Sequence, residues 1–167
     1  MNDIETLFKK YKNKGLLIDT NILLLLIIGI TNRDRISKFN RTENFTSDDY
    51  DLLLDIINKF SHIITTPNIL TEINSLINGV GEPERSKCVD TLAKIINTLN
   101  ENYLQSQEVV KNDKFIKFGL TDCGIMAICQ NKYLVLTDDL KLSNYLQSIN
   151  IDVINFNHLR FYDEFQN

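Results

Sequence analysis

The sequence lacks the long apolar runs that insertion into a membrane requires. Its longest such run, residues 22–30, is far shorter than the roughly 20 residues of a membrane-spanning helix and predicts a buried helix instead. Residues 1–14 are rich in charge and have no hydrophobic segment of the signal-peptide kind. The cysteines Cys88, Cys123 and Cys129 are few and odd in number, which favours reduced thiols. We therefore expect a soluble cytoplasmic protein with no membrane partner.

The sequence also lacks an excess of positive charge. It has 18 basic and 22 acidic residues, so its net charge of -4 does not attract nucleic acid over the whole surface. A polyanionic substrate would need a local basic surface or metal ions. No glycine-rich phosphate loop is present, which disfavours a nucleotide-binding enzyme. The two histidines, His62 and His158, have no convincing Ser or Cys partner for a catalytic triad.

What the sequence does contain is one domain of alternating strand and helix patterns. Its 167 residues, 43% of them hydrophobic, suffice for a single core over about residues 15–158. Four apolar runs predict strands, at residues 16–18, 62–65, 133–136 and 152–156. Helical patterns separate them, at residues 3–11, 22–29, 50–60, 67–79, 84–104, 119–129 and 140–147. This order predicts a three-layer α/β/α sandwich around a parallel sheet of four or five strands.

A polar stretch at residues 31–49 interrupts this order and predicts a surface excursion. Asp48 or Asp49 is expected to cap the helix that follows it. The densest basic run of the chain lies in this stretch and consists of Arg33, Arg35, Lys38 and Arg41. Two interpretations are open: an arm that contacts phosphates, with Phe39 or Phe45 stacking on a base, or a solvated loop.

Acidic residues follow the strands at positions that should meet. Asp19 ends the first strand and Glu72 lies early in the helix after the second, while Asp122 opens a helix and Asp138–Asp139 ends the third strand. Strand ends of a parallel sheet lie along one edge, where ligands usually bind. Carboxylates held there would repel unless a cation lay between them, and oxygen ligands suit Mg²⁺ or Mn²⁺. Such a site can hydrolyse phosphodiester bonds. For each acid alone, the alternative is a helix cap or a solvated charge.

Four motifs together resemble a PIN domain, and the resemblance covers residues 16–156. They are Leu-Leu-Ile-Asp-Thr-Asn at 16–21, Thr-Pro-Asn-Ile-Leu-Thr-Glu-Ile at 66–73, Gly-Leu-Thr-Asp at 119–122 and Val-Leu-Thr-Asp-Asp-Leu at 135–140. The family is best known for metal-dependent ribonucleases, including the toxins of bacterial toxin-antitoxin pairs. The resemblance therefore implies an endoribonuclease that uses Mg²⁺ or Mn²⁺ on RNA, as a toxin or as an RNA-processing or defence nuclease.

The same resemblance implies roles for individual residues and partners. The metal-binding catalytic acids would be Asp19, Glu72, Asp122 and Asp139, with Asp138 as a secondary candidate and Asn21 and Thr137 as supporting polar residues. An antitoxin-like protein inhibitor and a homodimer would be its partners. Two other functions stay open: a catalytically silent PIN-like scaffold that binds protein or RNA, and a phosphatase that forms an aspartyl-phosphate on Asp19. The phosphatase would need an acid where Asn21 stands.

Overall fold

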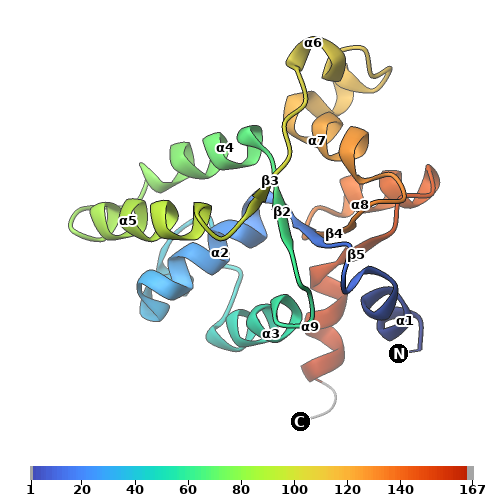
Figure 1. Cartoon of the computed structure of the whole chain (residues 1–167). Helices are drawn as coiled ribbons and strands as arrows, with labels where there is room; N and C mark the ends of the chain where they lie inside the picture. The colour runs from blue at the N-terminus through green and yellow to red at the C-terminus, as the bar shows by residue number, and fades with distance from the viewer. Residues whose placement is uncertain (1, 165–167) are drawn as a thin grey trace.

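Five short parallel strands form the central sheet of the computed structural model, which describes residues 2–164 (Figure 1). The strand order is β3-β2-β1-β4-β5. The strands are β1 (Leu16–Ile18), β2 (Ile63–Thr65), β3 (Asn100–Glu101), β4 (Leu134–Thr137) and β5 (Val153–Asn155). In the central register, Leu17 pairs with Ile64 on one side and with Val135 on the other. β1 and β4 are buried along their whole length, as expected for inner strands covered on both faces.

Helices cover both faces of this sheet, which confirms the predicted α/β fold class. They are α1 (Asn2–Tyr11), α2 (Thr20–Thr31), η1 (Arg33–Lys38), α3 (Ser47–Ile57), α4 (Pro67–Ile77), α5 (Glu84–Ile96), α6 (Ser106–Val109), α7 (Phe115–Cys129), α8 (Leu140–Ser148) and α9 (Phe156–Glu164). α2 packs against η1, α3, α4 and α5 on one side of the sheet, whereas α7 and α8 pack together on the other (Figure 1). Among the residues described, no helix is long and apolar enough to cross a membrane.

The apolar run after Asp19 forms α2, the most deeply buried helix. Its residues from Ile22 to Gly29 are buried. The helix was expected to stop near Gly29, where the ring of Tyr50 packs against the glycine, and it ends two residues later. The helix continues to Thr31, and the side chain of Asn32 then accepts a hydrogen bond from the backbone N–H of Asp34 and starts η1.

The polar stretch at residues 31–49 is largely exposed at the surface, as predicted, but it is anchored to the body. Its apolar side chains, Ile36, Phe39 and Phe45, are buried in the core. On α9, Arg160 donates a hydrogen bond to the backbone oxygen of Asn44 at 2.7 Å and pairs with Asp49 at 2.6 Å. The stretch therefore closes the side of the molecule between α2 and α9.

The N-terminal cap of α3 also differs from the prediction. Thr46, rather than Asp48 or Asp49, is the N-cap residue, and its hydroxyl accepts a hydrogen bond from the backbone N–H of Asp49. The carboxylate of Asp49 in turn accepts from the backbone N–H of Thr46 at 2.7 Å. This is a capping box, in which the threonine and the acid satisfy each other's backbone groups.

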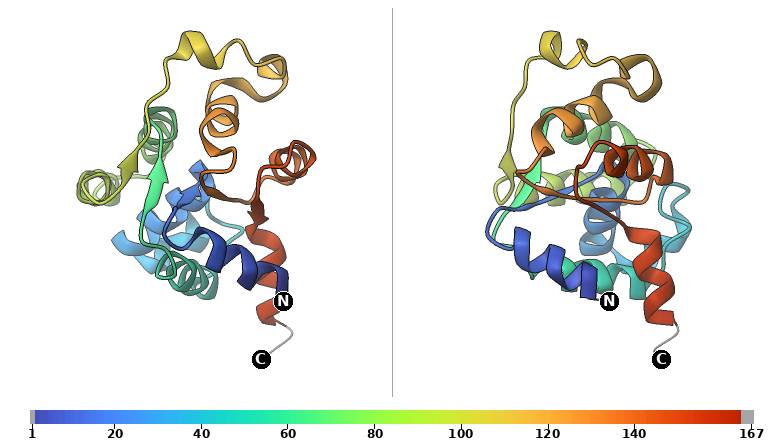
Figure 2. Two further views of the ribbon diagram at one scale, coloured as in Figure 1. Left: turned by 45° about the vertical axis from the view of Figure 1, so that its right-hand side comes forward. Right: turned by 90° about the vertical axis from the view of Figure 1, so that its right-hand side faces the viewer.

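The long helix predicted over residues 84–104 ends early. α5 stops at Ile96, and the chain then forms β3, which pairs with β2 and supplies the fifth strand. Both residues of β3 are exposed and polar, so no apolar pattern marks this edge strand. From β3 through α6 to the start of α7 the chain stands away from the body (Figure 2).

The helix that carries Asp122 begins where the sequence predicts. The backbone of Gly119 has φ 76° and ψ -169°, which breaks α7 into a short first part and the main helix. Positive φ favours glycine because it has no Cβ to clash with the backbone. The other predicted elements are present with shifted ends. Cys88, Cys123 and Cys129 are all free, as predicted, and all are buried.

Candidate active site

The carboxylate of Asp19 lies buried where β1 passes into α2. Its backbone N–H donates to the carbonyl of Leu136 on the neighbouring strand β4, so the two strand ends are tied together. Its side chain accepts one hydrogen bond from the backbone N–H of Thr20 at 2.7 Å and another from the hydroxyl of Thr137 at 2.6 Å. Burial raises the pKa of Asp19 to about 6, although these two hydrogen bonds oppose the rise. Asp19 is therefore held in one orientation by the first N–H of α2 and by Thr137 at the end of β4.

Glu72 reaches the same edge of the sheet from α4. Its two carboxylate oxygens each accept a hydrogen bond from a threonine hydroxyl, from Thr20 on α2 at 2.9 Å and from Thr121 on α7 at 2.5 Å. Thr20 follows Asp19 in the chain, and Thr121 precedes Asp122. Glu72 thus links the two helices that carry the other central acids.

The electrostatic surroundings of Asp122 give the most direct evidence that the predicted acids lie near one another. Burial, together with the negative charges of Asp19, Asp139 and Glu72 in that order, raises the pKa of the Asp122 carboxyl group to about 7. Lys141 on α8 acts in the opposite direction. Four acids that are far apart in the sequence are therefore within electrostatic reach of one another, at the carboxyl ends of β1 and β4.

The two acids after β4 have different surroundings. Asp139 caps α8, since its carboxylate accepts from the backbone N–H of Leu142 at 2.9 Å, and its own N–H donates to the hydroxyl of Thr137 at 3.0 Å. Asp138 accepts from the side-chain amide of Asn21 at 3.3 Å. Burial raises the pKa of Asp138. Thr137 therefore connects Asp19 with Asp139, whereas Asn21 supports Asp138 rather than the four-acid group.

The chemistry of this donor set suits a hard divalent cation, although the acids do not close around a point. Several carboxylates without sulfur or nitrogen ligands are typical of Mg²⁺ or Mn²⁺ sites. Within residues 2–164, no three His, Cys, Asp or Glu side chains form a group that could hold a metal ion as they stand. Asp19 and Glu72 are instead turned toward hydroxyl and N–H donors. A carboxylate has about four lone-pair positions, so these hydrogen bonds leave acceptor positions for an ion.

The basic run in residues 31–49 lies away from this edge. Arg33 pairs with Asp51 at 2.5 Å and Arg35 with Glu84 at 3.1 Å, while Lys38 and Arg41 are exposed. The run follows the C-terminal end of α2, whereas Asp19 precedes its N-terminal end. The helix between them has 12 residues, about 18 Å at 1.5 Å per residue. The structure therefore does not bring these basic residues to the carboxylates.

The expected stacking of Phe39 or Phe45 on a base is contradicted by their burial. Phe39 is 7% exposed and Phe45 is 4% exposed. The ring of Phe45 packs against Phe156 and lies under the guanidinium of Arg160. Both rings belong to the core and have no face available to a nucleotide.

Sequence reasoning missed three contributors to the site: the hydroxyls of Thr20 and Thr121 and the ammonium of Lys141. Each threonine is adjacent in sequence to one of the predicted acids, which is a usable signal. Lys141 stands two residues after Asp139 in the first turn of α8, but only the packing of α8 on α7 brings it toward Asp122.

A comparison with models of known protein families gave no match for this chain, and neither did a comparison with curated proteins.

Proposed function

We propose that the protein is a divalent-metal-dependent endoribonuclease of the PIN-domain type, which hydrolyses phosphodiester bonds in RNA. The observation that carries this proposal is the mutual repulsion of Asp19, Glu72, Asp122 and Asp139, which contributes to a pKa of about 7 for Asp122. Repelling carboxylates at the edge where ligands bind in parallel sheets reduce the stability of the fold, and they are retained where function needs them.

Asp19 and Asp122 would be the central ligands of Mg²⁺ or Mn²⁺, with Glu72 and Asp139 beside them. When bound, such an ion lowers the pKa of a coordinated water molecule and offsets negative charge on the phosphate. The protein's own residues prepare the site for this role. Thr137 fixes the Asp19 carboxylate, and the hydroxyls of Thr20 and Thr121 fix Glu72.

Asp122 contributes a further property, because its pKa lies close to neutral pH. Near pH 7 its carboxyl group is divided between the protonated and ionised forms. A proton on an Asp122 oxygen relieves the repulsion from Asp19, Asp139 and Glu72.

The test is cleavage of single-stranded RNA in Mn²⁺ by the parent protein and by Asp19→Asn. We expect the parent to cleave and the variant to lose most of this activity, since the amide cannot replace the carboxylate as a ligand. Asp55→Asn is the matched control, because Asp55 is an exposed residue of α3 and the same charge is removed. Equal cleavage by the parent and Asp19→Asn would exclude the assignment.

The observation that favours the silent scaffold is that the described acids do not form a ready group for an ion. Calorimetric titration of the folded parent with Mn²⁺ separates the two functions. Heat that is present in the parent and absent in Asp19→Asn supports the nuclease. No binding to the parent would favour a scaffold that binds protein or RNA.

A further inference from the structure

The strongest unexplained feature beside the acids is a pair of lysines on α7 and α8. The ammonium of Lys141 donates a hydrogen bond to the backbone oxygen of Lys117 at 3.1 Å and lies 4.9 Å from the centre of the Phe118 ring. The ammonium of Lys117 lies 5.0 Å from the same ring. Both contacts fix cationic side chains that would otherwise sample many rotamers. Two positive charges are therefore gathered around one aromatic side chain.

These lysines differ from the basic run of residues 31–49 because they lie on the same side of the molecule as the four acids. Among residues 2–164 neither Lys117 nor Lys141 takes part in an ion pair, a property they share with other exposed lysines such as Lys38 and Lys132. Lys141 is also close enough to Asp122 to lower its pKa. Positive charge thus lies within electrostatic reach of Asp122, although the protein as a whole is negative.

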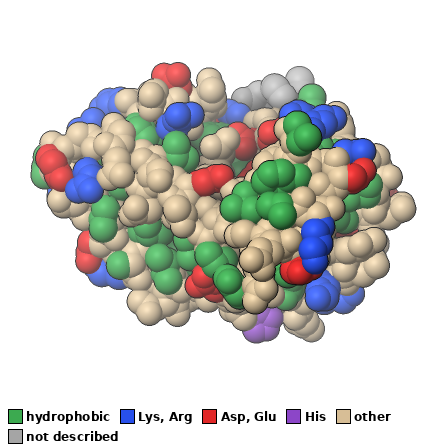
Figure 3. All heavy atoms as spheres, turned by 90° about the horizontal axis from the view of Figure 1, so that it is seen from above, with side chains coloured by type: hydrophobic (Ala, Val, Ile, Leu, Met, Phe, Trp, Pro, Cys, Tyr) green, Lys and Arg blue, Asp and Glu red, His purple; other side chains and the backbone are tan. Residues whose placement is uncertain are grey.

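The surface around the lysines is open and partly apolar. A shallow hollow of about 630 Å³ is lined by Lys117, Leu140, Lys141, Asn144 and Tyr145. Leu140 is 54% exposed, and the ring of Tyr145 stacks on Phe118 with centroids 4.8 Å apart. Figure 3 looks down on the face that carries α6 and α7 and shows acidic side chains near its middle, beside a group of hydrophobic ones.

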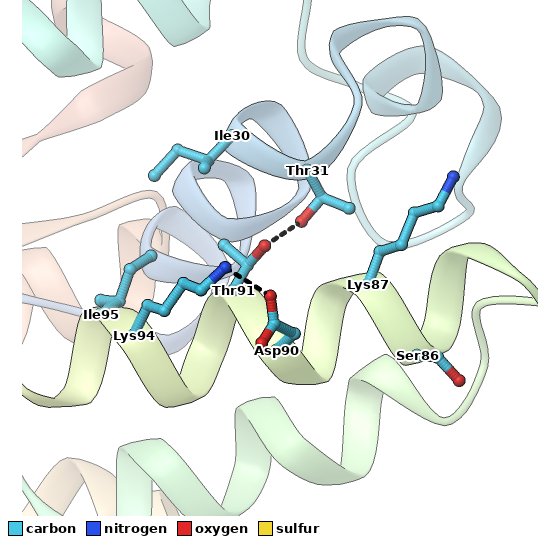
Figure 4. A pocket seen from close by; sticks show the side chains of 8 residues that line it. All are labelled: Ile30, Thr31, Ser86, Lys87, Asp90, Thr91, Lys94 and Ile95. Carbon is cyan, nitrogen blue, oxygen red and sulfur yellow. Dashed lines mark hydrogen bonds and ion pairs between the residues drawn. The ribbon is translucent and has the colours of Figure 1, made fainter.

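A second hollow, between α2 and α5, lies at the C-terminal end of α2 and so away from Asp19 (Figure 4). Its Lys94 is paired with Asp90 at 2.6 Å, and Thr31 donates to Thr91 at 2.9 Å. Polar groups that satisfy each other in this way have less to offer a ligand. The hollow on α7 and α8 is therefore the better candidate for a binding surface.

We propose that Lys117 and Lys141 bind the backbone phosphates of single-stranded RNA and lead the strand to the four acids. Lysines attract phosphates as point charges, and the exposed Leu140 with the half-buried ring of Tyr145 offers an apolar surface for unpaired bases, a combination typical of single-strand binding. This inference deepens the proposed function and rests on it for the choice of RNA. It assigns RNA binding to Lys117 on α7 and Lys141 in the first turn of α8, in place of the basic run in residues 31–49.

The test is the affinity for a short fluorescent single-stranded RNA, measured by anisotropy over a series of salt concentrations. EDTA is present throughout, so that no metal-dependent cleavage interferes. The variants are Lys117→Gln and Lys141→Gln, with Lys132→Gln as the matched control. Lys132 is exposed and precedes β4, so it lies at the opposite edge of the sheet from Asp139. Circular dichroism confirms that each variant is folded.

We expect Lys117→Gln and Lys141→Gln each to weaken binding and to reduce the slope of log K against log salt by about 0.7. This is the value for one lost phosphate contact on a single strand. Lys132→Gln should leave the slope unchanged, and duplex RNA should compete poorly. An unchanged slope in both hollow variants would overturn the inference, as would equal competition by the duplex. If the parent cleaves RNA but the salt slopes of Lys117→Gln and Lys141→Gln are unchanged, the proposed nuclease function is supported and this binding surface is excluded. If the slopes are reduced but the parent does not cleave RNA, the binding surface is supported and the proposed nuclease function is excluded.

Discussion

Replacing Asp122 by Asn is expected to stabilise the metal-free protein. Burial and the neighbouring charges of Asp19, Asp139 and Glu72 raise the pKa of Asp122 to about 7. An amide of almost the same shape carries no charge, so it avoids both the loss of hydration and the repulsion. The same change removes a group that the proposed nuclease needs. Stability and activity should therefore change in opposite directions.

The magnitude follows from the two pKa values. An unfolded Asp122 ionises near its ordinary pKa of 3.8, whereas the folded one keeps its proton until about pH 7. Because the folded pKa is raised, the fold loses stability as the pH rises from about 4 to about 7, and above that the loss is complete. The full gap corresponds to about 4 kcal/mol. The side chain is only partly buried, so solvent screening reduces this to about 2 kcal/mol.

The assay is thermal unfolding in EDTA at pH 8 and at pH 5. For a chain of this length, about 2 kcal/mol corresponds to a rise in Tm of about 4–8 °C for Asp122→Asn at pH 8. The rise should be less than half as large at pH 5, where the folded parent is still protonated. Asp55→Asn, an exposed change, should stay within about 0.5 kcal/mol of the parent. A variant that melts no higher than the parent at pH 8 would refute the reasoning.

Two further substitutions test how the fold supports the site. Gly29→Ala should destabilise the protein by about 1–3 kcal/mol in urea unfolding, because the added Cβ would overlap the Tyr50 ring. The control is Gly124→Ala, whose Cβ would meet open space inside α7. It should be neutral or stabilising by up to about 1 kcal/mol. If both variants unfold alike, the close packing at Gly29 has no energetic consequence. Arg160→Met should cost about 3 kcal/mol in the same assay, since it leaves the buried Asp49 without its cation, and a loss below about 0.5 kcal/mol would contradict this.

The parallel sheet could be predicted because its inner strands are short apolar runs bounded by local signals. Thr66 caps α4 with Pro67 in its first turn, and Gly119 sets the start of the helix that carries Asp122. β3 could not be predicted, because two exposed polar residues become a strand only through backbone pairing with β2. The anchored course of residues 31–49 also depends on a distant partner, Arg160.

The shared edge of the four acids could be predicted from topology alone, since carboxyl ends of parallel strands lie together. Their hydrogen bonds could not. Thr121 is 49 positions from Glu72 in the chain and Thr137 is 118 positions from Asp19, so only the packing of the helices and strands decides which hydroxyl meets which carboxylate. The same holds for Lys141, whose position beside Asp122 depends on how α8 packs on α7.

These hydroxyls change how the acid group is understood. Repelling carboxylates were expected to need a cation between them, yet here Asp19 and Glu72 are held by hydroxyl and N–H donors. Thr137 and the backbone N–H of Thr20 favour the ionised form of Asp19, and a proton shared near pH 7 relieves Asp122. A divalent ion that binds this group would therefore displace a proton from Asp122. The ion would not be needed for the site to fold, because the hydrogen bonds already hold the carboxylates. Its affinity should accordingly rise with pH through about 7, because the proton and the ion compete for the same carboxylate.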